Sequence, residues 1–309
     1  MPSERYQGPI IDAHHHFWDL GLKKHPWLSS TGSEDELAPI RKNFLPPEYE
    51  KLAREANIVA SVHVEANWDP ADPLGEVKWL DSLDRSPGIA SSYVAYAPLR
   101  DPIANTLLEQ YALHERIVGV REILSWHPDP GKSRTKDNEC MADPRWRQNL
   151  AQFEKYDLIF ELLISPWQLS DARRLAEDFP QIQFVLNHCG SPMDRDEEGM
   201  RRWSDGLNLA AKAPNVLIKI SDPAIYDPHW TFDSLAHVIL TCIEAFGPYR
   251  SIFASDHPVA GLHIDFLQWI TVFRQVTQDF SEDEKAALFF ENARAHYKIP
   301  TLGETLPVS

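Results

Sequence analysis

The sequence predicts an α/β fold, a (β/α)8 barrel of parallel strands, from three observations. Eight short segments rich in β-branched and apolar residues recur along the 309-residue chain. Between them lie longer stretches with the apolar period of amphipathic helices. Polar residues gather near the carboxyl ends of the apolar segments, although a strand covered on both faces is expected to be almost wholly apolar. Strands that alternate with helices in this way are typical of a parallel barrel.

The elements follow one another in a regular order. The first strand is predicted from Ile10 and Ile11, which lead into three histidines. A last helix opens with Ser281 and Glu284 at the spacing of a capping box, and it is expected to close over the barrel. The predicted strands span residues 9–16, 60–66, 90–99, 117–124, 158–165, 183–190, 215–221 and 251–258. The predicted helices span residues 46–56, 74–85, 103–114, 144–156, 168–179, 199–213, 232–246, 264–278 and 281–297.

No repeat beyond this alternation and no linker divides the chain. Because barrels of about 250 residues or more are common, we predict a single domain over 1–309, with the barrel over about 9–280. Four connections that follow strands are long, and in a barrel they lie on the carboxyl-terminal face, where active sites are built. These loops, which predict a lidded pocket, span residues 17–45, 125–143, 191–198 and 222–231.

The composition argues against several kinds of partner. A net charge of −16, with no cluster of Lys or Arg to offset it, disfavours nucleic acid and anionic membrane surfaces. Cys140, Cys189 and Cys242 lie far apart, so a reducing compartment is expected rather than a disulfide framework. Residues 1–9 contain no apolar signal core, and no stretch approaches the ~18 apolar residues of a membrane span. We therefore expect a soluble, cytoplasmic protein, and the sequence is compatible with a homo-oligomer.

His14 and His16 stand at the end of the first predicted strand. Side chains two apart on a strand share a face, so both can point at one place, as paired metal ligands or catalytic imidazoles. A buried histidine with an ordinary structural partner is the alternative for either residue. Polar residues near the ends of other predicted strands favour a shared site; they are His63, Glu65, Arg121, Glu161, His188, Lys219, Asp256 and His257.

Five short motifs occur along the chain in a fixed order: DAHHHFW at 12–18, GVR at 119–121, NHCG at 187–190, SDHP at 255–258 and FENAR at 290–294. Together they resemble the second amidohydrolase family, and the resemblance extends from residue 10 to about 299. Within that family the chain is most similar to the lactonase branch, which acts on sugar lactones and on pyrone or muconate lactones, 2-pyrone-4,6-dicarboxylate among them.

The resemblance implies roles for several of the polar residues. In the family, the pair represented here by His14 and His16 ligates a divalent metal ion in many members. The carboxylate represented by Asp256 takes a proton from the attacking water, and His188 binds or polarises the carbonyl. Lactone hydrolysis needs an activated water, a base beside it, and donors or positive charge where the oxyanion develops. Arg121 is therefore expected to help stabilise the oxyanion and to orient the substrate.

The chain departs from the family at two positions. Binuclear members carry a lysine at the end of the fourth strand, where this chain has Arg121, so a bridged pair of metal ions is not expected. Decarboxylating members have a histidine before Pro-Trp after the fifth strand, where this chain has Ser165. His14, His16 and Asp256 still supply three of the about four ligands that zinc prefers. We predict a single divalent ion, Zn or Mn, with a metal-free mechanism as the alternative.

The substrate is expected to contact charged and aromatic side chains near the strand ends. Arg121 is either a clamp for a carboxylate or carbonyl group, or a structural partner of Glu65 or Glu161. The roles of His63 and Lys219 stay open, as does that of His257. The residues predicted to bind substrate are Arg121, Glu65, Trp126, Tyr226 and His257.

We predict a hydrolase that opens a lactone of a sugar acid, or of a pyrone- or muconate-type acid, by attack of a water activated by Asp256. The sequence contains no GxSxG, HExxH or GxGxxG motif, which argues against serine hydrolases, metalloproteases and dinucleotide-binding enzymes. One alternative is a metal-dependent decarboxylase of the same superfamily, against which Ser165 argues. The other is a barrel that binds a small molecule without turnover.

Overall fold

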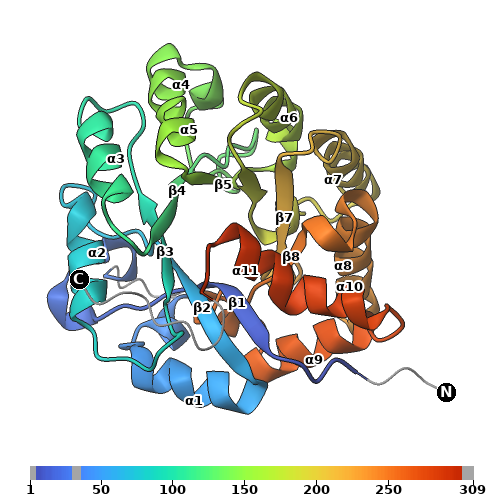
Figure 1. Ribbon diagram of the computed structural model, residues 1–309. Helices are drawn as coiled ribbons and strands as arrows, with labels where there is room; N and C mark the ends of the chain where they lie inside the picture. Colours follow the sequence, from blue (N-terminus) through green and yellow to red (C-terminus); the bar gives the residue numbers. More distant parts are fainter. Residues whose placement is uncertain (1–4, 30–35, 301–309) are drawn as a thin grey trace.

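The computed structural model describes residues 5–29 and 36–300, so residues 30–35 of the predicted loop 17–45 and both ends of the predicted domain lie outside it. Its centre is a parallel sheet of eight strands in the order β1 to β8, enclosed by helices (Figure 1). This arrangement confirms the predicted (β/α)8 barrel. The strands are β1 Ile10–His15, β2 Ile58–Val64, β3 Ser92–Tyr96, β4 Ile117–Ile123, β5 Ile159–Leu163, β6 Phe184–Leu186, β7 Val216–Ile220 and β8 Ser251–Phe253.

The loop after β8 closes the barrel against β1. The N–H of Asp256 donates to the carbonyl oxygen of His14 at 2.8 Å. The buried carboxylate of Asp12 accepts the Ser255 N–H at 2.8 Å and the Ser255 hydroxyl at 2.6 Å. Because these bonds join β1 to the loop after β8, the histidines of one and Asp256 of the other face the same point.

Local signals set the ends of several helices. The hydroxyl of Thr231 accepts the N–H of Ser234, one of the free N–H groups in the first turn of α8. The predicted bounds 46–56 and 232–246 match α1 and α8, whereas the predicted helix 144–156 is two helices that meet at Ala151, whose ψ of −21° is that of a 3-10 turn. The helices are α1 Pro46–Ala56, α2 Pro73–Ser82, α3 Ala104–Ala112, α4 Pro144–Leu150, α5 Gln152–Tyr156, α6 Leu169–Asp178, α7 Glu197–Ala210, α8 Phe232–Phe246, α9 Phe266–Val276, α10 Glu282–Ala286 and α11 Asn292–His296.

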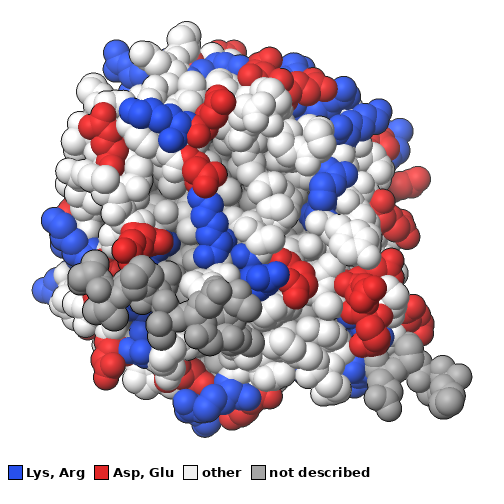
Figure 2. Space-filling view, viewed as in Figure 1, with Lys and Arg blue, Asp and Glu red and all other residues white. Residues whose placement is uncertain are grey.

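The surface carries charges of both signs. Figure 2 shows acidic and basic side chains interspersed over the face seen in Figure 1, without a large area of one sign. Within residues 5–29 and 36–300, no helix is long and apolar enough to cross a membrane.

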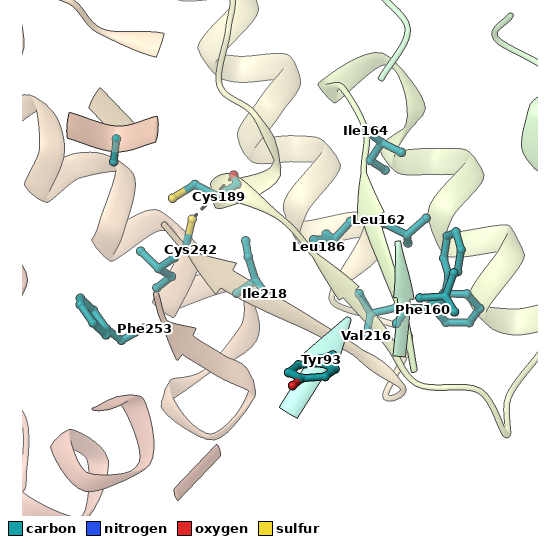
Figure 3. Close-up of a cluster of buried hydrophobic side chains, with 14 of the residues drawn as sticks. Tyr93, Phe160, Leu162, Ile164, Leu186, Cys189, Val216, Ile218, Cys242 and Phe253 are labelled. Carbon is teal, nitrogen blue, oxygen red and sulfur yellow. Dashed lines mark hydrogen bonds between the residues drawn. The ribbon is translucent and has the colours of Figure 1, made fainter. Parts of the chain in front are cut away.

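The core has an outer and an inner layer. Phe160, Leu186 and Ile218 are fully buried and belong to the outer layer, between the strands and the helices (Figure 3). The neighbouring residues Val185 and Leu217 belong to the inner layer, inside the barrel. Since side chains alternate along a strand, a polar residue at an inward position lies inside the barrel and needs a partner there.

Residues 287–299 cover the amino-terminal opening of the barrel. After α10, a π-helical turn over Ala287–Glu291 leads into α11, which lies inside the ring of strands in Figure 1. Tyr297 and Ile299 then join the inner layer formed by residues such as Ile11 and Val185. The predicted helix 281–297 thus closes the barrel in three consecutive pieces.

All eight strands end before the residue that the sequence predicts, and β6 and β8 differ from the prediction most. β6 ends at Leu186 and β8 at Phe253, so His188 and Asp256 lie in turns beyond the strands. Both residues have left-handed backbone, with φ of 48° and 56°. Because this conformation ends the extended chain, the direction of these side chains does not follow the alternation of the strands.

Candidate active site

A cavity of about 630 Å³ opens at the carboxyl ends of the strands. His16 after β1, His188 after β6, Asp222 after β7 and Asp256 after β8 contribute polar groups to its wall. Apolar side chains of the loops form most of the rest, and Trp27 lies among them. A mostly apolar cavity with a few convergent polar groups is typical of a small-molecule site.

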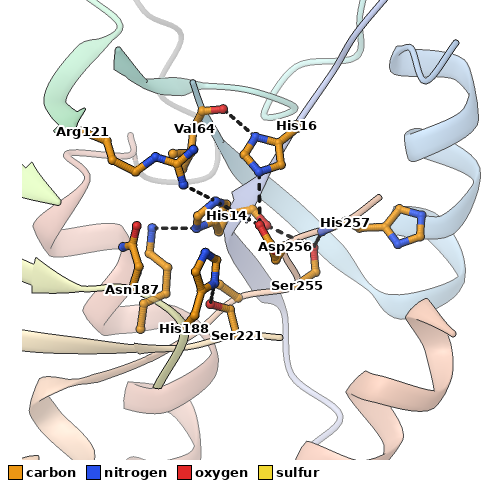
Figure 4. A network of polar contacts seen from close by, with 12 residues as sticks. His14, His16, Val64, Arg121, Asn187, His188, Ser221, Ser255, Asp256 and His257 are labelled. Carbon is orange, nitrogen blue, oxygen red and sulfur yellow. Dashed lines mark hydrogen bonds and ion pairs between the residues drawn. The ribbon is translucent and has the colours of Figure 1, made fainter. Parts of the chain in front are cut away.

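His14, His16 and Asp256 converge on one point in this region (Figure 4). Nε2 of His14 and Nε2 of His16 each lie 3.1 Å from Oδ1 of Asp256. All three side chains are buried, and their possible ligand atoms lie within 4.8 Å of one another. The fold therefore brings together the three residues that the sequence predicts as metal ligands.

The bonding of His16 tests whether a metal ion fits this point. Nδ1 of His16 lies 2.8 Å from the carbonyl oxygen of Val64, which can only accept, so Nδ1 carries the proton. In the neutral ring Nε2 then has a lone pair, which faces a carboxylate oxygen of Asp256 at 3.1 Å. Two acceptors at this distance repel each other unless a proton or a cation lies between them. Two imidazoles and a carboxylate are also ligands that zinc accepts, so the residues present fit a divalent ion.

His14 has cationic neighbours on both sides of its ring. Nζ of Lys219 lies 3.5 Å from Nδ1, and Nη1 of Arg121 lies 3.3 Å from Nε2. Burial, and next Lys219, lower the pKa of His14 well below its ordinary value. Lys219 is held in turn by Glu161 at 2.6 Å. His14 is therefore a neutral ring that can offer a lone pair.

Asp256 and His188 have the protonation states that acid–base chemistry needs. Burial favours a higher pKa for Asp256, but His188 and His16 outweigh it and hold that pKa below its ordinary value. Burial lowers the pKa of His188 to about 4. Nδ1 of His188 lies 2.9 Å from the hydroxyl of Ser221. When this hydroxyl donates to Nδ1, the proton of the neutral ring sits on Nε2, which can donate into the cavity.

Arg121 is paired with Glu65. Nε of Arg121 donates to the carboxylate of Glu65 at 2.7 Å, and Nη2 donates to the carbonyl oxygen of the same residue at 2.6 Å. Of the two alternatives that the sequence leaves open, the structural bridge is thus present. Arg121 nevertheless lines the cavity, so its Nη1 edge lies at the site.

Asp222 is a residue of the site that the sequence analysis did not single out. It is 1% exposed and lines the cavity. Burial and the adjoining carboxylate of Asp256 raise the pKa of Asp222 well above its ordinary value. Its position in the sequence could have indicated this role. Asp222 directly follows the seventh predicted strand, and polar residues of the site also lie near the ends of other predicted strands.

The other predicted residues occupy different places. Tyr226 lines the cavity, whereas Glu65, Trp126 and His257 are not part of its wall. His257 points away from the cluster of polar side chains in Figure 4 and packs edge-on against two phenylalanine rings. His63 accepts the backbone N–H of residue 17 at 3.0 Å, so its contact is with the chain after β1.

Comparisons with known proteins cover nearly the whole chain. A family model described as Amidohydrolase matches residues 11–299. The chain is 32% identical to the uncharacterised protein y4mH of Sinorhizobium fredii, over 94% of this chain and 98% of that protein. It is 25% identical to an L-fucono-1,5-lactonase of Burkholderia multivorans, over 94% and 96% of the two chains. A crystal structure of an amidohydrolase from Burkholderia multivorans with bound zinc superposes with a TM-score of 0.81 at 23% identity, covering 95% of this chain and all of that one.

Proposed function

Because this chain belongs to the amidohydrolase family, we propose that it is a hydrolase that opens a lactone of a sugar acid, or of a pyrone- or muconate-type acid. The observation that carries the proposal is the convergence of Asp256, His14, His16 and His188 beside the cavity of about 630 Å³. A base and neutral imidazoles at one point suit the attack of water on an ester carbonyl. The similarity to an L-fucono-1,5-lactonase supports the choice of a cyclic ester.

Asp256 is the general base in this proposal. Its carboxylate takes a proton from water as the water oxygen bonds to the lactone carbonyl carbon. The Nε2–H of His188 and the Nη1 edge of Arg121 donate to the carbonyl oxygen as negative charge develops on it. The bond from the carbonyl carbon to the ring oxygen then breaks, and Asp256 returns the proton to the leaving ring oxygen. The product is an open-chain hydroxy acid.

A single divalent ion, zinc or manganese, completes the proposed site, with His14, His16 and Asp256 to hold it. When bound, such an ion supplies Lewis-acid polarisation of the oxygen that it contacts. The protein's own contribution is orientation, since the carbonyl of Val64 fixes the tautomer of His16 and Lys219 approaches the ring of His14.

The first test combines metal analysis with a substrate panel. Protein purified without added metal is analysed for its elements and assayed with a pH indicator on sugar, pyrone and muconate lactones, before and after chelation. We expect lactone hydrolysis, about one zinc or manganese ion per chain, and loss of activity on chelation. Hydrolysis that persists without metal assigns the oxyanion role to His188 and Arg121 alone.

Replacement of the base gives the first mutational prediction. Asp256→Asn is expected to lower kcat/KM by about 10²–10⁴-fold, because an amide cannot take the proton from water. Asp101→Asn, which changes an exposed carboxylate on a surface loop, is the matched control and is expected to keep wild-type activity. Circular dichroism and thermal melts check that both variants fold. Unchanged turnover in Asp256→Asn, or a wild type that leaves every lactone intact, would contradict the proposed function.

A further inference from the structure

Asp222 is a buried carboxyl of the site whose hydrogen bonding is incomplete. Neither of its side-chain oxygens accepts a well-formed hydrogen bond from a described residue. Two other buried carboxylates of the same region have strong donors, since Glu65 accepts from Arg121 at 2.7 Å and Glu161 accepts from Lys219 at 2.6 Å. Buried polar groups in folded proteins nearly always have a partner, and the Ile225 N–H and the carboxyl of Asp256, which lie nearest to Asp222, form no well-aligned bond with it, so the carboxyl has room for a further donor.

The backbone around Asp222 holds this carboxyl against the cavity. Asp222 has φ 41° and ψ 48°, a left-handed conformation that Asp and Asn adopt more readily than most residues. Ser221 before it is bonded to His188, and the 3-10 turn Pro223–Tyr226 follows it. The carboxyl lines the cavity beside Asp256. A molecule in the cavity can therefore reach this carboxyl and donate to it.

The charges around the cavity show which kind of donor suits Asp222. Arg121 is neutralised by Glu65, and Lys132, exposed at the cavity edge, is paired at 2.6 Å with Asp194, a carboxylate that it shares with Arg202. Among the described residues of the wall, Arg134 is exposed to solvent and has no ion pair within 4.0 Å. The buried wall thus offers two carboxyls, Asp222 and Asp256, and no uncompensated cation. Asp256 keeps its negative charge, which a substrate carboxylate would meet there, whereas a substrate hydroxyl can donate to an oxygen of Asp222.

Resting on the lactonase function proposed above, we infer that Asp222 is a specificity-determining residue that accepts a hydrogen bond from a substrate hydroxyl. Asp256 acts on the water that attacks the carbonyl carbon, and Asp222 adjoins Asp256. The hydroxyl it binds is therefore the one on the carbon next to the lactone carbonyl. The substrate is a polyhydroxylated lactone rather than a carboxylated ring.

The test compares a hexono-1,5-lactone with its 2-deoxy counterpart and with a carboxylated pyrone. The wild type is expected to prefer the hydroxylated lactone over the deoxy lactone by about 10²-fold or more in kcat/KM, since a site built to bind a hydroxyl rejects the analogue that lacks it. Asp222→Asn is expected to reduce this ratio at least tenfold, and Asp222→Gly to abolish it. Both replacements tolerate left-handed backbone, and a ratio of two substrates cancels any effect common to both.

A matched control lies in the same segment of chain. Asp227 is paired with Arg195 at 3.0 Å and is not part of the cavity wall, so Asp227→Asn makes the same acid-to-amide change outside the cavity and is expected to keep the wild-type ratio. An unchanged ratio in both Asp222 variants, with lactone hydrolysis intact, overturns this inference alone. A wild type that prefers the carboxylated pyrone, or loss of bound metal in Asp222→Asn, also overturns it. Absence of hydrolysis on every lactone overturns the proposed function and this inference together.

Discussion

The buried side chain of Glu161 holds several groups that lie next to the histidines of the site. Its carboxylate accepts Nζ of Lys219 at 2.6 Å, the hydroxyl of Tyr297 at 2.7 Å and the amide of Asn187 at 2.8 Å. Lys219 also approaches Nδ1 of His14 at 3.5 Å. One carboxylate therefore links β5, β7, the residues after β6 and Tyr297, which follows α11, to a histidine of the site.

Removing the cation of this pair should strongly destabilise the fold. Lys219→Met introduces an apolar side chain of similar length and leaves Glu161 ionised and without its cation. Both residues are fully buried. We expect a loss of about 3–5 kcal/mol in the free energy of unfolding at pH 7, measured by urea denaturation. Lys219 holds the pKa of Glu161 below its ordinary value against the effect of burial. Without Lys219 that pKa rises, so the difference from wild type should shrink as the pH falls and Glu161 takes up a proton.

Lys155→Met is the matched control for this prediction. Lys155 is exposed on α5, where ion pairs and ring contacts contribute little. Its replacement is expected to change the free energy of unfolding by less than about 1 kcal/mol. If the two substitutions lower the free energy of unfolding equally, the buried pair of Lys219 and Glu161 does not stabilise the fold more than an exposed lysine does.

At the scale of elements, a hydrogen bond to a buried glutamate of α2 connects this helix to the chain just after β2. Glu76 lies in α2, is 3% exposed, and its carboxyl accepts the N–H of Ala66 at 2.8 Å. Burial, and next the charge of Glu65, raise the pKa of Glu76 to about 8. In the unfolded chain the same group titrates near 4.5. Between these two values the folded protein holds a proton that the unfolded chain has released, so stability falls as the pH rises through this range.

Glu76→Gln should remove this pH dependence. Its amide oxygen can still accept the N–H of Ala66, but the side chain no longer titrates. The variant is therefore expected to gain stability relative to wild type as the pH rises from about 5 to 8, by a few kcal/mol at most. Denaturation midpoints measured at several pH values check this. Glu109→Gln, an exposed position on α3, should follow the wild-type curve, and parallel curves for all three proteins would refute the prediction.

The order of the elements was predictable because apolar period and capping chemistry are local. The helices 46–56 and 232–246 were predicted to the residue. The ends of β6 and β8 were not, because the turns at His188 and Asp256 have left-handed backbone. A non-glycine residue adopts this conformation only when surrounding contacts fix it, and those contacts come from other strands.

For the whole molecule, the decisive contact is the one that closes the ring of strands. The carboxylate of Asp12 accepts hydrogen bonds from the Ser255 N–H and hydroxyl after β8, from the Tyr49 hydroxyl of α1 and from the His14 N–H. The first and last parts of the barrel, 243 residues apart in the chain, thus share one buried acceptor. The same contact sets the distance between the histidines of β1 and Asp256.

Asp12→Ala should therefore affect stability and activity together. Four buried donors lose this acceptor, of which the Ser255 hydroxyl keeps the carbonyl oxygen of His14 at 3.1 Å, and each donor left unsatisfied costs about 1–3 kcal/mol before the structure relaxes. We expect a loss of about 3 kcal/mol or more in the free energy of unfolding, with a fall in kcat/KM in the fraction that stays folded. Asp101→Ala, which removes one exposed carboxylate that accepts the Ile103 N–H, should cost about 1 kcal/mol or less. A similar small cost for Asp12→Ala would contradict the role given to the closure.

The sequence by itself determined the barrel and the identity of the three side chains that converge, His14, His16 and Asp256. The convergence of His14 and His16 followed from strand alternation, whereas Asp256 was assigned by its place near the end of the last predicted strand and by the resemblance to the amidohydrolase family. Only the tertiary structure decided that Arg121 is paired with Glu65 and that Asp222 accepts no well-formed hydrogen bond from a described residue. The physical reason is that the apolar pattern and the spacing of residues indicate only on which face of a strand or helix a side chain lies. The partner of a buried charge is chosen by strands that the chain brings together only on folding.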